Sequence, residues 1–357
     1  MTTSNLLFIE QPKHDSHRQP FPKPHLEAFE TPLRIEMAVK YLDDHKVLDD
    51  FKRLTAKRAK TKDALLVHSP FLVESVERMS EIGSGQLGES AFASPELLRS
   101  ALYALGGSIE AAKGAVSGEY RHSFAAIRPP GHHAATSTSM GLCYFNNIAV
   151  SITKIMKEDG VKRVSIIDFD DHFGNGTAEI FYTNPDVQYI SVHEYDYESY
   201  GIGHFEEVGH GKGKGTNVNI PLVESSPDVS YDAALKRVVI PMIERFEPEI
   251  IAVSAGYDAH YSDPVGNMNI DSRTFWLIGK MVENVVSSLN LHGSFWILEG
   301  GYNPLALGPC IRASLAGLIG LPLPKLEDQV DREEYSTLVD ANEEVIEKVL
   351  EVHSSAL

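Results

Sequence analysis

The chain has 357 residues, of which 43% are hydrophobic and 23% are charged. This composition is typical of a soluble globular protein and excludes a disordered or collagen-like chain. No stretch reaches the roughly 18 consecutive apolar residues that a membrane-spanning helix needs. The net charge of −18 disfavours nucleic acid or an anionic membrane as a partner, because their phosphates would be repelled.

The chain has two cysteines, Cys143 and Cys310, which lie far apart in the sequence. Two are too few for a disulfide framework or a cysteine-rich zinc site. The first twenty residues lack the basic and long apolar regions of a secretion signal. We therefore expect a cytoplasmic, reducing setting, in which histidines and carboxylates would hold any metal ion.

Short apolar runs alternate with helix-length segments along the chain. The runs predict strands at Ser123–Ile127, Val164–Ile167, Val187–Val192, Asn217–Ile220, Ile250–Ser254 and Ser294–Leu298. Helices are predicted at Pro95–Val116, Asn146–Lys157, Tyr231–Phe246, Ser272–Leu289 and Pro304–Leu318. This alternation indicates an α/β fold with a mostly parallel sheet covered on both faces.

The rest of the chain adds little to this pattern. The basic run Phe51–Lys62 is interpreted as a solvated helix face. We expect one domain over residues 1–357, with a core at about 30–320 and an acidic helical segment at about 326–357 that packs one apolar face on the core.

The strongest chemical signal is the segment IDFDDHFGNGT at residues 167–177, which follows a buried strand. Asp168, Asp170 and His172 alternate along the chain and would project on the same side. Two carboxylates and an imidazole that converge at a strand end favour a divalent cation. The alternative is an aspartate that caps the next helix beside an ordinary packed histidine.

Other polar groups also follow predicted strands. They are His132 and His133 in RPPGHH, Asp258, His260 and Asp263 in AGYDAHYSDP, and Glu299 and Tyr302 in EGGYN. In open α/β sheets, ligands bind at the carboxyl ends of the strands, so these groups predict one site at that edge. Each has a simpler interpretation: Asp263 as a turn residue before Pro264, Tyr302 as a surface tyrosine after a glycine turn, and the histidine pair as one surface and one buried residue.

In combination and order, RPPGHHA, GLCYFNN, DFDDHFGNGT, SDP and LEGGYN resemble the zinc-dependent histone deacetylase and acetylpolyamine amidohydrolase family. The similarity covers roughly Glu30 to Gly320. The GNGT and LEGGYN variants look closer to the class II and bacterial branches than to class I. The resemblance implies an arginase-deacetylase-like three-layer fold, with a central, mostly parallel sheet flanked by helices.

The resemblance also implies roles for individual residues. Zinc would be held by Asp170, His172 and Asp263. The catalytic groups would be His132, His133 and Tyr302, with Asp168 behind His132 and Asn175 behind His133. A potassium ion would bind near the zinc through Asp168, Asp170, His172, Ser191 and Val192.

The remaining implied positions concern the substrate. Arg34 would line an internal pocket that takes acetate. The acyl-lysine tunnel would be lined by Leu142, Tyr200 and Gly300, with Glu89 as a rim carboxylate. Leu142 stands where relatives usually have phenylalanine, and Phe173 where many have a second histidine.

The expected function is removal of acetyl or short acyl groups from acyl-lysine or acetylpolyamine by metal-activated water. One Zn²⁺ per chain is expected, although one imidazole and two carboxylates also suit Fe(II), Co(II) or Mn(II), and K⁺ would be a structural ion. The alternatives are an arginase-like binuclear manganese ureohydrolase and a non-catalytic acyl-lysine binding module. The sequence leaves a homo-oligomer open.

Overall fold

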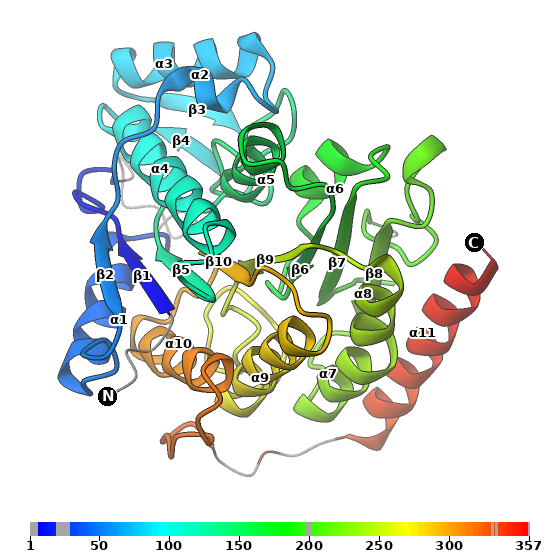
Figure 1. Cartoon of the computed structure of the whole chain (residues 1–357). Helices are drawn as coiled ribbons and strands as arrows, with labels where there is room; N and C mark the ends of the chain where they lie inside the picture. Colours follow the sequence, from blue (N-terminus) through cyan, green and yellow to red (C-terminus); the bar gives the residue numbers. More distant parts are fainter. Residues whose placement is uncertain (1–5, 19–28, 198–200, 330–331, 333–334, 356–357) are drawn as a thin grey trace.

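A central sheet of eight parallel strands organises the computed structural model, which describes residues 6–18, 29–197, 201–329, 332 and 335–355 (Figure 1). The strand order is β2-β1-β5-β10-β9-β6-β7-β8. The strands are β1 (Leu6–Glu10), β2 (Lys52–Thr55), β5 (His122–Ala126), β6 (Val164–Asp168), β7 (Val187–Glu194), β8 (Asn217–Leu222), β9 (Ile250–Ala255) and β10 (Ser294–Leu298). Because every neighbouring pair is parallel, all eight carboxyl ends lie at one edge of the sheet.

Helices cover both faces of this sheet (Figure 1). One layer holds α4 (Leu97–Val116), α5 (Asn147–Glu158) and α6 (Asn175–Phe181). The other holds α1 (Pro32–Asp44), α7 (Asp228–Ala234), α8 (Ile240–Phe246), α9 (Ser272–Ser288), α10 (Pro304–Leu318) and α11 (Ser336–Ser355). A smaller lobe adds α2 (Thr61–Ala64), α3 (Pro70–Ile82) and the hairpin β3 (Gly85–Gly88) and β4 (Ala91–Ala93).

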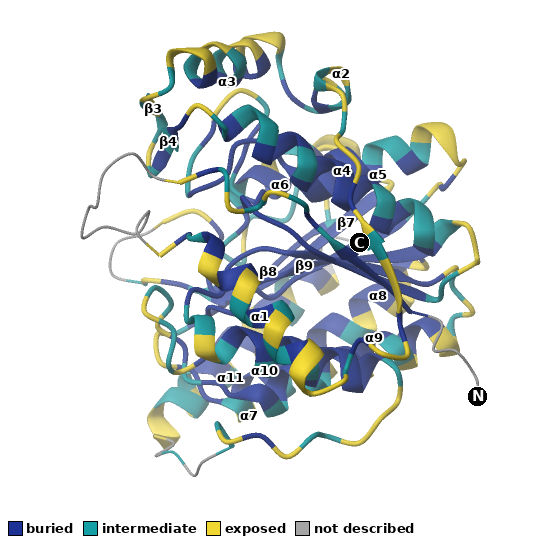
Figure 2. Ribbon diagram, turned by 90° about the vertical axis from the view of Figure 1, so that its left-hand side faces the viewer, coloured by how far each residue is buried: buried dark blue, intermediate teal, exposed yellow. Residues whose placement is uncertain are grey.

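The strands are apolar on both sides because each side meets a helical layer. In β1, Leu6 and Phe8 pack into the core cluster of one layer, and Leu7 and Ile9 pack into that of the other. Strands buried in this way show continuous apolar runs rather than alternation. Figure 2 shows the result as dark blue strands between helices whose outer sides are exposed.

Three helices that begin near the carboxyl edge of the sheet have side-chain caps. Asn146 caps α5, Asp271 caps α9 and Asn303 caps α10, each by accepting a backbone N–H from the first turn. Such caps satisfy N–H groups that have no partner within the helix. They fix the direction in which the chain leaves the loops after β5, β9 and β10.

The six predicted strands and the predicted α/β class are confirmed, whereas the interpretation of the basic run Phe51–Lys62 as a helix face is wrong. Lys52–Thr55 forms β2, the edge strand, whose charged side chains face solvent. Charged edge strands resist pairing with other chains. The helix predicted at Tyr231–Phe246 is interrupted by a π-helical segment at Leu235–Val239, because Pro241 has no N–H to continue the α-helical pattern.

In the acidic segment near the C-terminus, residues Ser336–Ser355 form α11, which buries Val345, Ile346 and Val349 against the core. Strand β1 adds residues before position 30 to the sheet. Among the described residues, no helix combines the length and hydropathy needed to cross a membrane.

Three buried histidines are held neutral by the fold. Burial lowers the pKa of His17, His68 and His193 to about 4 in each case. The hydrogen bonds of His68 are those of a neutral ring, since Nε2 accepts the N–H of Asn146 at 2.8 Å and Nδ1 donates to the carbonyl of Ala135 at 2.9 Å.

Because these three histidines are neutral in the folded protein, we expect the protein to be less stable to unfolding at acidic pH. Unfolded histidine has a pKa near 6.5, so below that pH the unfolded chain binds protons that the folded chain excludes. The stabilisation is complete above about pH 6.5 and is lost as the pH falls toward about 4. Each histidine is expected to lower the free energy of unfolding by about 2 kcal/mol between about pH 7.5 and about pH 5. Urea unfolding at the two pH values measures this, and an equal or higher midpoint at the lower pH would contradict it.

Candidate functional site

The loops after four neighbouring strands, β5, β10, β9 and β6, form the candidate site. These strands are adjacent in the middle of the sheet, so their carboxyl ends bring together segments that are far apart in the sequence. The loops carry the histidine pair after β5, Asp170 and His172 after β6, Asp258 after β9, and Tyr302 after β10. This is the edge at which the sequence predicted a site.

Asp170, His172 and Asp258 form a group whose ligand atoms all lie within 4.8 Å of one another. Nδ1 of His172 is 3.2 Å from Oδ1 of Asp170 and 3.1 Å from Oδ2 of Asp258. Both aspartates are buried, whereas the His172 side chain is 38% exposed. The protein therefore encloses the two carboxylates, whereas the His172 side of the group is accessible to solvent.

The structure corrects the predicted third member of this group, which was Asp263. The Asp263 carboxylate accepts backbone N–H groups: Oδ2 those of Tyr302 and Asn303, and Oδ1 those of Val265 and Gly266. Its oxygens are thus occupied in shaping the loops around Tyr302. Asp258, three residues after the end of β9, takes the predicted place beside Asp170 and His172.

The donor set fits a divalent cation. Burial opposes a charge on His172, yet its hydrogen bonds with Asp170 and Asp258 raise its pKa well above the usual value. A proton thus sits between the two carboxylates, where a metal ion would supply the same compensation. Two carboxylates and one imidazole are also ligands that zinc accepts, with room for further ligands.

Glycine permits the close packing of this group. A Cβ at Gly300 would lie 2.2 Å from Oδ2 of Asp258 and 2.6 Å from Oδ2 of Asp170. The Gly300 N–H donates to Oδ2 of Asp170 at 2.8 Å. Gly300 therefore forms the wall behind the two carboxylates, and any side chain there would displace them.

His132 is a buried imidazole surrounded by carboxylates. Its Nδ1 lies 3.1 Å from Oδ2 of Asp168, and its Nε2 lies 3.7 Å from Oδ1 of Asp170. Burial alone would lower its pKa, but the charges of Asp170 and Asp168 outweigh burial and raise the pKa to about 10. His132 is therefore protonated near neutral pH.

His133 is held in the opposite protonation state. Burial, together with the charges of His132 and His172, places its pKa well below the usual value. Its Nδ1 is 2.7 Å from Oδ1 of Asn175, so Nδ1 carries the proton and Nε2 keeps a free lone pair. The two rings of the pair lie 4.0 Å apart. The site thus contains one charged histidine and one neutral histidine beside the carboxylate group.

Tyr302 lies against Arg34 in the same region. The Arg34 guanidinium is 4.4 Å from the centre of the Tyr302 ring. Burial, only partly opposed by Arg34, raises the Tyr302 pKa well above the usual value, so the phenol remains protonated. Arg34 itself is fully buried and donates to the carbonyls of Gly301 and Glu299 and to the carboxylate of Glu30.

Glu299 was noted in the sequence but given no role, and the structure places it under the histidine pair. Its Oε2 accepts the N–H groups of Gly131 at 2.6 Å and of His132 at 3.2 Å. Its Oε1 is buried with no partner, and burial raises its pKa to about 7. A buried carboxylate with an unused oxygen costs stability, which points to a functional reason for keeping it.

Comparison with known proteins shows to which family a chain with this site belongs. A sequence profile for the histone deacetylase domain matches residues 28–318. The chain belongs to the histone deacetylase family. Its crystallised relatives include the HDA15 HD domain, with a TM-score of 0.87 at 27% identity over 99% of this chain and 95% of that one.

Two prokaryotic proteins are similar to most of the chain. A histone deacetylase-like amidohydrolase of Pseudomonas aeruginosa is 33% identical over 83% of this chain and 77% of its own length. A probable deacetylase of Archaeoglobus fulgidus is 35% identical over 83% of this chain and 84% of its own length. A chloroplastic histone deacetylase of Oryza sativa is 42% identical over 56% of this chain, but that match spans only 45% of the rice protein.

The residues expected to bind potassium in this deacetylase-family chain lie at the end of β6, in the loop that follows it, and on β7. Oδ2 of Asp168 accepts the Tyr189 hydroxyl at 3.0 Å, and its Oδ1 accepts the Asp170 N–H at 3.2 Å. The Ser191 hydroxyl pairs with Nδ1 of His193 at 2.8 Å, and Val192 is buried next to it. Asp168 and Ser191 are paired in register on the adjacent strands β6 and β7. This pairing brings the expected potassium ligands of the two strands close together.

The expected tunnel residues are only partly placed at the site. Leu142 is 5% exposed and has a positive φ of 67°, and the preceding Gly141 packs so close to His133 that a Cβ there would lie 2.4 Å from the ring. Glu89 is exposed in the β3–β4 turn, and its carbonyl accepts the Gly141 N–H at 2.9 Å. Tyr200 lies outside the described residues.

Proposed function

We propose that this chain is a metal-dependent deacetylase that hydrolyses the amide bond of acetylated lysine side chains or acetylpolyamines. One observation carries the proposal: a cation-binding group, a protonated histidine, a neutral histidine and a protonated tyrosine converge at one edge of the sheet. This combination suits acyl transfer to water. Family membership supports it, and so do the names of the two prokaryotic relatives.

We assign the metal to Asp170, His172 and Asp258, with Zn²⁺ as the first choice. When bound, it would polarise the substrate carbonyl and lower the pKa of water. Fe(II), Co(II) and Mn(II) suit the same donors. Two ionised aspartates and a neutral histidine carry a charge of −2, so a divalent cation makes the buried group neutral.

The two histidines would have different roles, with His133 transferring a proton and His132 remaining charged. Nε2 of His133 has the free lone pair that accepts a proton from the attacking water, and Asn175 holds the ring in that orientation. The same proton then passes to the leaving amine, which is a poor leaving group without it. His132 keeps its charge between Asp168 and Asp170 and stabilises negative charge as it develops on the substrate.

Tyr302 would donate a hydrogen bond to the oxyanion of the tetrahedral intermediate. Its raised pKa keeps the hydroxyl proton in place, which a donor requires. The contact with Arg34 and the Asp263 carboxylate on the Tyr302 N–H fix the position of the ring. Arg34 would also line the pocket into which acetate leaves.

Other parts of the function are proposed from the family resemblance. A structural K⁺ would bind through Asp168, Asp170, His172, Ser191 and Val192. Leu142 and Gly300 would line the acyl tunnel, with Glu89 at its rim. A reducing, cytoplasmic location agrees with Cys143 and Cys310, which are both free and buried.

A substrate panel tests the proposed function. Purified protein loaded with Zn²⁺ is incubated with acetyl-lysine peptides, acetylputrescine, acetylspermidine and trifluoroacetyl-lysine, and the released amine is measured. We expect hydrolysis of at least one acetyl amide. Binding of acetyl-lysine peptides with no hydrolysis of any panel member would instead indicate a binding module.

Glu299→Gln is expected to slow turnover without unfolding the protein. The glutamine carbonyl can still accept the Gly131 N–H, but the negative charge that helps to hold His132 protonated is lost. We expect kcat to fall by about tenfold or more with little change in KM, and the alkaline limb of the pH–rate profile to move to lower pH. Steady-state kinetics from about pH 6 to about pH 10 measure both.

Glu283→Gln is the matched control. Glu283 is a carboxylate of α9 that pairs with Arg121 and His122 at the opposite edge of the sheet. This variant should retain the wild-type pH–rate profile. An unchanged kcat and profile in Glu299→Gln would remove Glu299 from the account of the site.

A further inference from the structure

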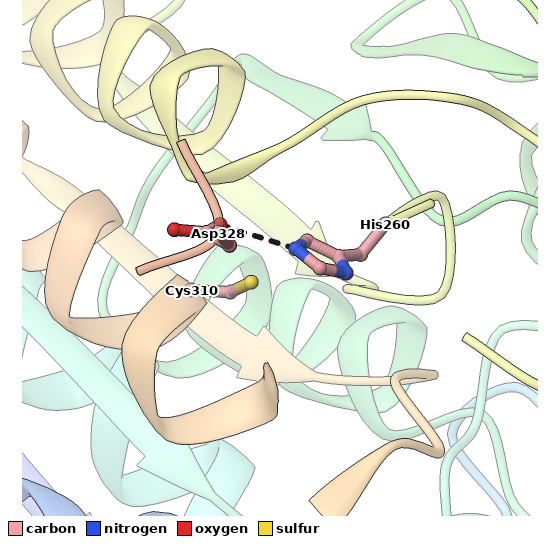
Figure 3. Close-up of side chains that lie close together, drawn as sticks. All are labelled: His260, Cys310 and Asp328. Atoms are coloured by element: carbon pink, nitrogen blue, oxygen red, sulfur yellow. Dashed lines mark hydrogen bonds and ion pairs between the residues drawn. The ribbon is translucent and has the colours of Figure 1, made fainter. Parts of the chain in front are cut away.

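A second group of potential metal ligands lies outside the candidate active site. It consists of His260 in the loop after β9, Cys310 in α10 and Asp328 in the segment that follows α10. One ligand atom from each lies within 4.8 Å of the other two. Figure 3 shows the His260 ring and the Asp328 carboxylate pointing toward each other, with the Cys310 sulfur beside the line that joins them.

We propose that His260, Cys310 and Asp328 form a second, structural site for Zn²⁺ or a chemically similar divalent ion. Imidazole, thiolate and carboxylate are the three ligand types of protein zinc sites. A hard cation such as Mg²⁺ or Ca²⁺ would not select a thiolate. The group shares no residue with Asp170, His172 and Asp258, so its ion would be distinct from that of the candidate active site.

Charge and burial favour an ion here. His260 and Cys310 are buried, and the Asp328 side chain is 12% exposed. A neutral imidazole, a thiolate and a carboxylate together carry −2, so a divalent cation makes the buried cluster neutral. Asp328 is the one member that touches solvent, and it gives the ion a route to the site.

The hydrogen bonds of His260 show what ion binding would change. Nε2 lies 3.1 Å from Oδ2 of Asp328, and Nδ1 lies 2.9 Å from the Ser262 hydroxyl and accepts the Ser262 N–H at 3.2 Å. On binding, the ion takes Nε2 and the imidazole proton moves to Nδ1, which gives up the Ser262 N–H and donates to the Ser262 hydroxyl; ligating histidines generally donate their second nitrogen in this way. Cys310 loses its thiol proton to solvent. The step therefore releases one proton for each ion bound.

The simpler reading is a clamp made of hydrogen bonds alone. Asp328 also accepts the N–H and hydroxyl of Ser272, so it is anchored without a metal. That reading gives Cys310 no role, although its sulfur lies beside the His260–Asp328 pair. An ion would use the sulfur and would join three segments that are distant in the sequence.

Cobalt substitution separates the two readings. The metal-free protein is titrated with Co²⁺, while near-ultraviolet absorption records thiolate-to-cobalt charge transfer. Because the candidate active site offers only oxygen and nitrogen ligands, this absorption reports the second site alone. We expect the band in the wild type, with two Co²⁺ bound per chain.

The two free buried cysteines provide a matched pair of variants. Cys310→Ala should lose the band and bind one Co²⁺ per chain, whereas Cys143→Ala should keep the band and bind two. Circular dichroism and thermal unfolding establish that both variants fold. If Cys310→Ala fails to fold, Asp328→Asn serves as the test in its place. This change lies near the surface and should weaken the band.

Absence of the band in the wild type, or its persistence in Cys310→Ala, would overturn the proposal and leave a hydrogen-bonded clamp. The readout does not depend on amide hydrolysis. A missing band beside normal activity would therefore refute only the second site, and a normal band without activity would refute only the proposed function.

Discussion

Tyr302→Phe is expected to lower kcat by a factor of about 10² to 10³ while the protein folds and binds its metal normally. The substitution removes only the hydroxyl that would donate to the oxyanion, and the loss of one such donor is worth about 3–4 kcal/mol in the transition state. The ring would still pack on Arg34, and its N–H would still donate to Asp263. KM should therefore change much less than kcat.

The matched control for Tyr302→Phe is Tyr257→Phe. Tyr257 is another buried tyrosine in the loops of this edge, and its hydroxyl bonds to Ser314 rather than facing the candidate site. The control should lose some thermal stability and keep kcat. A Tyr302→Phe variant with near-normal turnover would show that the hydroxyl does not take part in the reaction.

Asp258→Asn is expected to abolish activity by removing the metal. The asparagine amide is neutral, so the buried group has one negative charge less with which to bind the cation. Metal affinity should therefore fall by more than about 100-fold, which exceeds the loss typical of residues that only orient a metal ligand. Metal content measured by elemental analysis after gel filtration, together with turnover, tests this. The thiolate–cobalt band of the proposed second site should remain, which checks that the loss is local.

Asp263→Asn is the control that decides between the two aspartates. Because Asp263 holds backbone N–H groups around Tyr302, its substitution should disturb the loop and reduce turnover without removing the metal. Retained metal in Asp258→Asn, with loss in Asp263→Asn, would restore the assignment made from the sequence.

Much of the fold could be predicted from the sequence because its strands are buried on both faces. The runs that became β6 and β9 are mostly apolar and are buried along their whole length, as strands covered on both faces are. The edge strand β2 could not be recognised, because it begins with the charged residues Lys52 and Arg53 and has no apolar run. It is a strand because it pairs with its single neighbour, β1, and not because of its composition.

The candidate site could also be predicted only in part from the sequence. The pairing of His132 with Asp168 and of His133 with Asn175 was implied by family motifs and is found in the structure. The third ligand implied by the same motifs, Asp263, differs from the residue that the structure places beside Asp170 and His172, which is Asp258. Both aspartates follow the same strand and lie only five residues apart. What distinguishes them is the direction that each carboxylate takes in the loop, and this depends on backbone N–H groups from another segment.

The contribution of Glu299 depends on contacts that sequence separation hides. Its carboxylate lies under Gly131 and His132, which are more than 160 residues away along the chain. A glutamate before two glycines carries no local sign of such a partner. The second group of ligands, His260, Cys310 and Asp328, was likewise not inferred from the sequence, since its members belong to three separate segments.

The measurement that tests the central claim most directly is amide hydrolysis during metal removal and return. Protein is treated with a chelator, freed of it, and assayed on an acetyl amide from the substrate panel as Zn²⁺ is added back. With the metal held by Asp170, His172 and Asp258, activity should disappear on chelation and return with added Zn²⁺ in the wild type but not in Asp258→Asn. Hydrolysis that continues unchanged in the chelated protein would contradict the metal-dependent account of the site.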